Sequence, residues 1–222
     1  MYLMETEIKL KFNDKDSLYN VALSDWFRRL IDNGTESKPV LLENLYLDTH
    51  DLKITNRTGM VRSRHCLSDT EEYTEFTVKF GGGTESGLHR RYEWNLRSDS
   101  NTFSIASFKG QVKEDDPSAY LDMVFEGLTD EDLMVICSNS FYRTVYDLSY
   151  GDSTIEACLD YGSIISSDGS RSEEICELEL ELKSGEVDDL KKLAGSIIAL
   201  TGCVPFDATK YGRTLAMANG GK

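Results

Sequence analysis

Charged residues alternate with apolar residues along the first predicted strand, where a strand usually contributes to the core. Within residues 4–12, Glu5, Glu7, Lys9 and Lys11 fall on one face, and most of the apolar side chains fall on the other. This period-two pattern predicts a strand with one polar and one buried face. It constrains the fold because the same pattern recurs further along the chain.

Other predicted strands also carry a charged face. These faces contain Arg62 and Arg64; Lys79; Arg91 and Glu93; Glu156 and Asp160; and Glu177, Glu179, Glu181 and Lys183. A single alternating strand is most often the solvated side of a half-exposed sheet, and each motif alone allows that interpretation. Their joint occurrence on several strands instead favours strands that surround a polar interior.

The predicted elements are strands joined by short links, with helices between some of them. Helices are predicted over 15–33, beginning at Asp14 or Asp16 and ending at Gly34, and over 185–202. A last helical stretch carries Lys210 and Arg213. Strands are predicted over 3–12, 40–48, 59–64, 72–80, 88–97, 140–149, 153–161 and 175–183, with Gly81-Gly82-Gly83 as a hairpin turn.

The segment 101–135 differs from the rest, because it has a helical, partly acidic pattern interrupted at Asp116-Pro117. We expect it to form two short helices outside the sheet. The short linkers and the lack of an internal repeat predict one domain over residues 1–218, followed by a tail at 219–222. Closure removes sheet edges and creates an interior. The predicted fold is therefore α+β, a closed eight-stranded antiparallel β-barrel with helices packed outside.

The formal net charge of −15 argues against a nucleic acid or an anionic membrane surface as partner. It does not exclude a small anionic ligand, because basic residues can line an interior while acidic residues cover the outside. The five scattered cysteines show no CxxC spacing, which predicts reduced thiols in a cytoplasmic protein. No apolar run approaches the roughly 20 residues of a membrane helix. A monomer and a homodimer both remain compatible with the sequence.

The charged faces suggest what the interior binds. Residues 177–183 alternate strictly, and three carboxylates on one strand face repel one another unless water or cations intervene. Such a carboxylate set suits a hard divalent cation such as Mg²⁺. Arg62 and Arg64 present either a solvated face or two guanidinium groups for one phosphate chain. The glycine run at 81–83 lacks the Gly-Lys-Ser/Thr of a phosphate-binding loop.

Several segments resemble the CYTH, or triphosphate tunnel metalloenzyme, superfamily. Glu5-Thr6-Glu7-Ile8-Lys9 is similar to its N-terminal E-x-E-x-K signature, and Thr209-Lys210-Tyr211-Gly212-Arg213 resembles its C-terminal Ser-Lys segment. The likeness runs from about residue 5 to 213, although 101–135 matches no motif. Many bacterial relatives continue into a helical, histidine-rich CHAD domain, so we expect any activity here to come from the tunnel domain alone. Segments 87–93, 141–143, 155–162 and 175–185 resemble bacterial inorganic triphosphatases.

The resemblance implies a tunnel that binds inorganic triphosphate (tripolyphosphate) and hydrolyses it to pyrophosphate and phosphate with Mg²⁺ or Mn²⁺. It implies metal ligands at Glu5, Glu7, Glu177 and Glu179. Lys9, Glu93 and Glu181 are the candidate catalytic residues, and Glu156 and Asp160 are additional acidic candidates. The expected phosphate-binding residues are Arg62, Arg64, Lys79, Arg91, Arg143 and Lys210.

Other functions remain open on the same fold. A nucleotide or thiamine triphosphatase, or an adenylate cyclase, needs a surface for the organic group at the tunnel mouth. Trp94 has the opposite strand parity to Glu93, which predicts that it packs outside the tunnel and makes these functions less favoured. A polyphosphate-binding module without turnover would not need the acidic residues, because carboxylates beside a bound polyanion are costly unless a cation lies between them.

Overall fold

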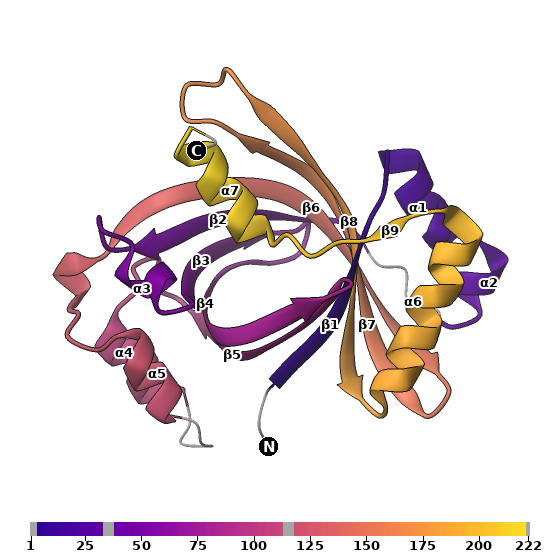
Figure 1. The fold of residues 1–222 in the computed structure, drawn as a ribbon, viewed down its shortest axis with the longest axis horizontal. Coiled ribbons are helices and arrows are strands. Elements are labelled where there is room, and N and C mark those ends of the chain that lie inside the picture. The colour runs from indigo at the N-terminus through magenta and orange to yellow at the C-terminus, as the bar shows by residue number, and fades with distance from the viewer. Residues whose placement is uncertain (1–3, 33–37, 113–117, 221–222) are drawn as a thin grey trace.

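The computed structural model describes residues 4–32, 38–112 and 118–220. Eight antiparallel strands form a closed barrel in the order β5-β4-β3-β2-β6-β7-β8-β1, and β5 pairs with β1 to close it. The predicted barrel is confirmed (Figure 1). Its strands are β1 (Met4–Lys11), β2 (Val40–Asp48), β3 (Gly59–Leu67), β4 (Glu72–Glu85), β5 (Leu88–Ser98), β6 (Met134–Tyr150), β7 (Ser153–Ile165) and β8 (Ser172–Ser184), with the short β9 (Val204–Pro205) beside β1.

The strand register brings the charged faces next to one another. Glu7 lies opposite Glu181 and Lys9 opposite Glu179 where β1 pairs with β8. On the other side of β1, Glu5 lies opposite Arg91 on β5. Because side chains alternate between the two sides of a strand, these charges all face the inside of the barrel.

The predicted helix over 15–33 is wrong in its extent. The chain instead forms α1 (Lys15–Leu23) and α2 (Asp25–Arg28), because Ser24 is extended with ψ 138° and its hydroxyl caps α2. Asp14 caps α1 as expected, by accepting a hydrogen bond from the Ser17 amide. Gly34 and the Asp116-Pro117 interruption lie outside the described residues. The remaining helices are α3 (Lys53–Asn56), α4 (Ile105–Gln111), α5 (Ser118–Val124), the 3₁₀ helix η2 (Asp130–Asp132), α6 (Val187–Thr201) and α7 (Lys210–Ala218).

The glycine run is part of a strand and does not form the predicted hairpin turn. β4 continues to Glu85, and its register with β5 shifts between Phe80 and Gly83. Gly82 has φ +105°, and a Cβ there would lie 2.3 Å from the Arg90 carbonyl oxygen, so the bulge requires glycine. The turn is at Ser86 and Gly87, which both have positive φ.

Two apolar layers outside the barrel support the wall. Helices α1, α2 and α6 pack on β1, β7 and β8 through a core that includes Leu10, Leu178 and Leu193. On another side, α4 and α5 cover β3, β4 and β5, and Trp94 packs there as predicted, away from the interior (Figure 1). The two short helices expected within 101–135 are therefore confirmed. No helix in the described part of the chain is long and apolar enough to cross a membrane.

Helix α7 lies across one opening of the barrel (Figure 1). Thr209 caps it by accepting a hydrogen bond from the Gly212 amide, and Lys210, Arg213 and Thr214 are all buried. These side chains therefore approach the inside of the barrel from a helix, whereas the other charges come from strands.

Candidate tunnel site

The barrel encloses a cavity of about 410 Å³. Among the described residues, eight cations and seven carboxylates line it, so the wall is nearly neutral although the chain carries a net charge of −15. The excess acidic charge lies outside this cavity. The lining cations are Lys9, Arg62, Arg64, Lys79, Arg91, Arg143, Lys183 and Lys210, and the lining carboxylates are Glu5, Glu7, Glu75, Glu93, Glu156, Glu179 and Glu181.

One group of ion pairs is centred on Glu5. The Lys79 Nζ lies 2.8 Å from Glu5 Oε1 and 2.9 Å from Glu93 Oε2. The Arg91 guanidinium spans the two carboxylates of β1, with Nε 2.9 Å from Glu5 Oε2 and Nη2 2.7 Å from Glu7 Oε1. Burial alone would raise the pKa of Glu93, but the Lys79 ammonium, a hydrogen bond with Glu5 and the charge of Arg62 together outweigh it and lower this pKa to about 2. Glu93 is therefore ionised at neutral pH.

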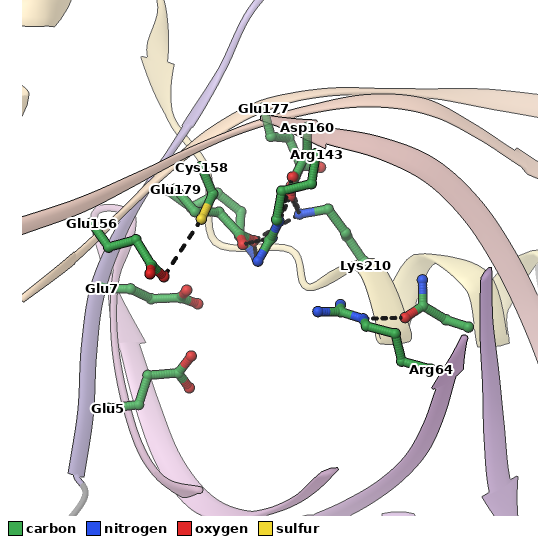
Figure 2. A network of polar contacts seen from close by, with 12 residues as sticks. Glu5, Glu7, Arg64, Arg143, Glu156, Cys158, Asp160, Glu177, Glu179 and Lys210 are labelled. Carbon is green, nitrogen blue, oxygen red and sulfur yellow. Dashed lines mark hydrogen bonds and ion pairs between the residues drawn. The ribbon is translucent and has the colours of Figure 1, made fainter. Parts of the chain in front are cut away.

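A second group of ion pairs lies towards α7 and is shown in Figure 2. The Lys210 Nζ is 2.7 Å from Asp160 Oδ2, 2.9 Å from Glu177 Oε2 and 2.7 Å from Glu179 Oε1. The Arg143 Nη2 is 2.6 Å from Asp160 Oδ2 and 2.5 Å from Glu179 Oε2. Two cations thus share the same carboxylates, which holds both cations at this side of the cavity.

Arg62 and Arg64 on β3 contact fewer carboxylates than Arg91, Arg143 and Lys210 do. The Arg62 Nη2 donates to Thr77 Oγ1 over 2.8 Å and lies 3.7 Å from Glu75 Oε1, while its buried Nε has no hydrogen-bond partner. The Arg64 Nε donates to Asn44 Oδ1 over 2.8 Å. Buried guanidinium donors without partners are costly, so this part of the wall is suited to an anionic ligand.

Burial and neighbouring cations also change the pKa of Arg64. Burial, together with the positive charges of Arg62 and Arg143, lowers this pKa to about 10. The guanidinium nevertheless stays protonated at neutral pH. Figure 2 shows Arg64 reaching into the open space on the side opposite Glu5 and Glu7.

Lys9 on β1 and Glu181 on β8 both line the cavity, and burial shifts the pKa of both. Burial lowers the pKa of Lys9 despite the nearby Glu179 and Glu7 carboxylates. Burial raises the pKa of Glu181 to about 7, with Lys183 opposing this shift and Glu5 among the carboxylates that add to it. Glu181 is thus a carboxyl group close to its titration point at neutral pH.

The cavity brings together all but two of the residues predicted from the sequence. Asp160 and Glu177 do not line it, because they lie behind Arg143 and Lys210 and are almost fully buried. Glu177 also pairs with Arg213, so its carboxylate is occupied by two cations. This arrangement does not favour Glu177 as a metal ligand.

Several residues of the site were not predicted from the sequence. Glu75 has the same strand parity as Lys79, and Arg213 follows Lys210 by three residues on one helix, so both had a usable signal. Asn44 lies between Leu42 and Tyr46 on the inward face of β2. A single uncharged amide on an apolar face gives no such signal, and its contact with Arg64 emerges from the strand register.

The acidic side chains of the cavity have the chemistry of ligands for a divalent cation. In their present positions, no three acidic, histidine or cysteine side chains of the described residues are arranged to hold a metal ion. The donor type nevertheless fits, because Glu5, Glu7 and Glu181 supply carboxylate oxygens to one cavity. Burial, with Glu5 and Glu156 nearby, raises the pKa of Glu181, so a cation bound here would stabilise its ionised form.

Comparison with known proteins places the chain in a family. Residues 3–204 match the CYTH domain. The chain is 33% identical over 189 residues to an inorganic triphosphatase of Haemophilus influenzae, covering 85% of this chain and 47% of that protein. It therefore spans about half the length of this relative.

Solved structures share the fold at low sequence identity. A protein from Hippeastrum, assigned as an adenylyl cyclase and reported to have a dominant triphosphatase activity, superposes with TM-score 0.65 at 18% identity, over 99% of this chain and 97% of the other. A Bacillus halodurans protein assigned as an adenylate cyclase gives TM-score 0.56 at 16% identity, over 95% and 96% of the two chains. The match to the domain and the closed barrel with its charged interior lead to one conclusion: the chain belongs to the CYTH domain family.

Proposed function

We propose that this protein hydrolyses inorganic triphosphate to pyrophosphate and phosphate inside the barrel, with a divalent metal ion. The observation that carries the proposal is the convergence of eight lining cations in one cavity of a strongly acidic protein. A cavity of this size and polarity suits a small polyanion. The inorganic triphosphatase activity of the Haemophilus influenzae relative supports the same substrate class.

The charge balance of the wall supports a role for metal. Seven carboxylates offset the eight cations among the described lining residues, so the wall has little net positive charge. Tripolyphosphate carries about four to five negative charges near neutral pH. Bringing this charge into a low-dielectric interior is costly unless further cations accompany it. A bound divalent cation would supply that charge and neutralise phosphate oxygens.

We assign the metal to the carboxylates at the Glu5 end of the cavity. Glu5, Glu7 and Glu181 are the proposed ligands, with Glu179 as the next carboxylate along β8. The family resemblance implied Glu177 in place of Glu181. We exchange the two because Glu177 is buried between Lys210 and Arg213, whereas Glu181 lines the cavity.

The remaining residues bind and orient the substrate. Arg62, Arg64 and Arg143 present guanidinium donors to the phosphate oxygens, and their charge favours the transition state of phosphoryl transfer. A water molecule attacks the terminal phosphorus, the bridging P–O bond breaks, and pyrophosphate leaves. Glu93, which is ionised at neutral pH, orients this water, the proton of the water passes to the departing pyrophosphate, and Lys9 contacts the scissile end.

Phosphate release from purified protein tests the proposal. Tripolyphosphate, ATP and thiamine triphosphate are compared at equal concentration with Mg²⁺, with Mn²⁺ and with EDTA. We expect metal-dependent release from tripolyphosphate that exceeds release from the other two and stops in EDTA. Faster turnover of ATP or thiamine triphosphate would replace the inorganic substrate with an organic one. Tight binding without release from any of them would indicate a polyphosphate-binding module.

A further inference from the structure

A row of buried neutral side chains connects Arg64 to helix α7. Asn44 on β2 lies opposite Arg64 on β3 and opposite Asn139 on β6. The Arg64 Nε donates to Asn44 Oδ1 over 2.8 Å, and Asn44 Nδ2 donates to Asn139 Oδ1 over 2.9 Å. Asn139 Nδ2 then donates to Thr214 Oγ1 over 2.7 Å. The Thr214 hydroxyl donates to the Lys210 carbonyl oxygen over 2.7 Å.

The direction of every hydrogen bond in this row follows from the guanidinium. Arg64 has donors and no acceptor, so Asn44 must turn its oxygen towards it. The amide nitrogen of Asn44 then faces Asn139, which must accept with its own oxygen. The nitrogen of Asn139 therefore points at Thr214, whose hydroxyl accepts this bond and in turn donates to the Lys210 carbonyl. The row has one consistent orientation from the cation to α7.

Burial makes this orientation costly to break. Asn44 is 1% exposed, Asn139 7% and Thr214 2%. A buried amide or hydroxyl that loses its partner keeps the full desolvation penalty of that group. In a low-dielectric interior a fully satisfied polar row therefore fixes its members in place.

Arg64 is held differently from the other cations of the cavity. Lys9, Arg62, Lys79, Arg91, Arg143, Lys183 and Lys210 each lie within ion-pair distance of at least one carboxylate. For Arg64, no carboxylate of the described residues lies within that distance, and Asn44 provides the hydrogen bond instead. An amide orients the guanidinium as a carboxylate would, but it leaves the positive charge uncompensated.

We propose that Asn44 and Asn139 are positioning residues that aim the Arg64 guanidinium at the bound phosphates without neutralising it. Through Thr214, the same row fixes the first turn of α7, which carries Lys210 into the site. This inference rests on the proposed function, because it takes the triphosphate as the ligand of Arg64.

The substitution Asn44→Asp tests the role of Asn44 directly, because it replaces the amide NH₂ with a carboxylate oxygen and keeps the side-chain shape. An aspartate would pair with Arg64 as carboxylates pair with the other cations. Asn139 can rotate its amide to donate to the new carboxylate, and Thr214 can then donate to Asn139. We therefore expect a folded protein whose melting temperature equals or exceeds that of the wild type, with weaker binding of tripolyphosphate.

Calorimetric titration with diimidotriphosphate, a non-hydrolysable analogue of tripolyphosphate, in the presence of Mg²⁺ measures this affinity without turnover. The Kd of Asn44→Asp should rise about ten- to hundredfold, the range for a lost hydrogen bond to a charged group. Asn20→Asp adds the same charge on the exposed face of α1 and should leave the Kd within about twofold. A purely structural Asn44 would give a lower melting temperature with an unchanged Kd. That result would overturn the proposal.

A second pair of variants tests the link to α7. Thr214→Val keeps the shape but removes the hydroxyl, while Thr214→Ser keeps the hydroxyl. We expect a Kd raised about threefold or more for Thr214→Val and a Kd within about twofold of the wild type for Thr214→Ser. Equal Kd values for both would overturn the link. Wild-type binding without phosphate release would contradict the proposed function alone, because these comparisons need no turnover.

Discussion

At the scale of single residues, Glu5 and Glu7 of β1 form ion pairs in the structure, and we propose that they also bind a metal ion. Glu5 and Glu7 face the cavity because they alternate with buried residues on β1. Without ligand, they are balanced by Lys79 and Arg91. In our proposal they bind metal when the triphosphate draws these cations away. Under that proposal, each carboxylate would exchange a protein cation for a metal ion.

Glu5→Gln and Glu7→Gln should lower activity by weakening metal binding. Loss of groups that merely support metal ligands costs about 10–100-fold in affinity, so loss of a ligand should cost at least that. The check is the Mg²⁺ concentration for half-maximal phosphate release, which should rise about tenfold or more in each variant. Glu85→Gln, an exposed position at the hairpin tip, serves as the control. Unchanged metal dependence in both variants would remove Glu5 and Glu7 from the metal site.

The identity of the residues and their alternation along the strands predicted some residues of the site and missed others. Period-two alternation identified most of the inward charges, because parity alone decides which side of a strand a residue occupies. It did not identify Asn44, and it treated Glu177 like Glu179. The difference between these two carboxylates arises from α7, whose Lys210 and Arg213 cover Glu177. A contact made by a distant helix leaves no trace in the local pattern.

At the scale of elements, two glycines show how the barrel wall and its supporting helix differ. Gly162 on β7 packs against β6 so closely that a Cβ would lie 2.5 Å from the Phe141 Cβ and 2.6 Å from its Cα. Gly195 in α6 has open space, because a Cβ added there would have no atom of another described residue within 4 Å, apart from its chain neighbours and the helix's own backbone. The first glycine is required by packing, and the second only lowers helix stability.

Gly162→Ala and Gly195→Ala should therefore change stability in opposite directions. Overpacking against the β6 backbone should destabilise the first variant by about 1–3 kcal/mol. The second should gain about 0.5–1 kcal/mol, because alanine restricts the unfolded chain and favours helix. Urea unfolding followed by circular dichroism measures both free energies. A destabilised Gly195→Ala variant would contradict the open space around Gly195, and an unchanged stability of Gly162→Ala would contradict the close packing of Gly162 on β6.

The spacing of apolar residues predicted helices and strands well where the tertiary contacts favour the same structure. The extent of α6 and the outward packing of Trp94 follow from simple periodicity. The single helix over 15–33 and the hairpin turn at 81–83 were wrong. In both cases a local backbone feature decided the outcome: the extended Ser24 in one, and a bulge that continues β4 in the other. Neither the extended Ser24 nor the bulge in β4 changes the spacing of apolar residues, so the sequence pattern does not reveal them.

At the scale of the whole molecule, closure of the barrel determines where thiols can react. All five cysteines are free and buried. Burial raises the pKa of Cys137 and of Cys176 to about 12, and it raises the pKa of Cys158 even though that residue lines the cavity. A thiol with a pKa near 12 is ionised in about one molecule in ten thousand at pH 8, and the thiolate is the reactive form.

The native protein should therefore react very slowly with Ellman's reagent at pH 8. In denaturant, where the pKa values return to their ordinary range, all five thiols should react within minutes. The measurement is the absorbance released per protein chain with and without guanidinium chloride. Fast reaction of Cys137, Cys176 or Cys203, which do not line the cavity, would show that the barrel opens, contrary to the packed wall described above.

The closed barrel was predictable because many short strands each needed a partner and a polar interior. The near balance of charge inside was not, because it depends on the register of eight strands and on the position of α7. Binding of the triphosphate in this interior is the step on which the proposed function and the role of Asn44 both depend. Because this step concerns where the triphosphate lies, a structure with the ligand bound tests it.

The decisive measurement is a crystal structure of the protein with saturating diimidotriphosphate, a non-hydrolysable analogue of tripolyphosphate, and Mg²⁺. We predict the three phosphates inside the barrel, in contact with Arg62, Arg64 and Arg143. The Asn44 amide should still hold Arg64 in that complex. Phosphates bound outside the barrel, or a cavity filled with solvent alone at saturating ligand, would contradict this prediction.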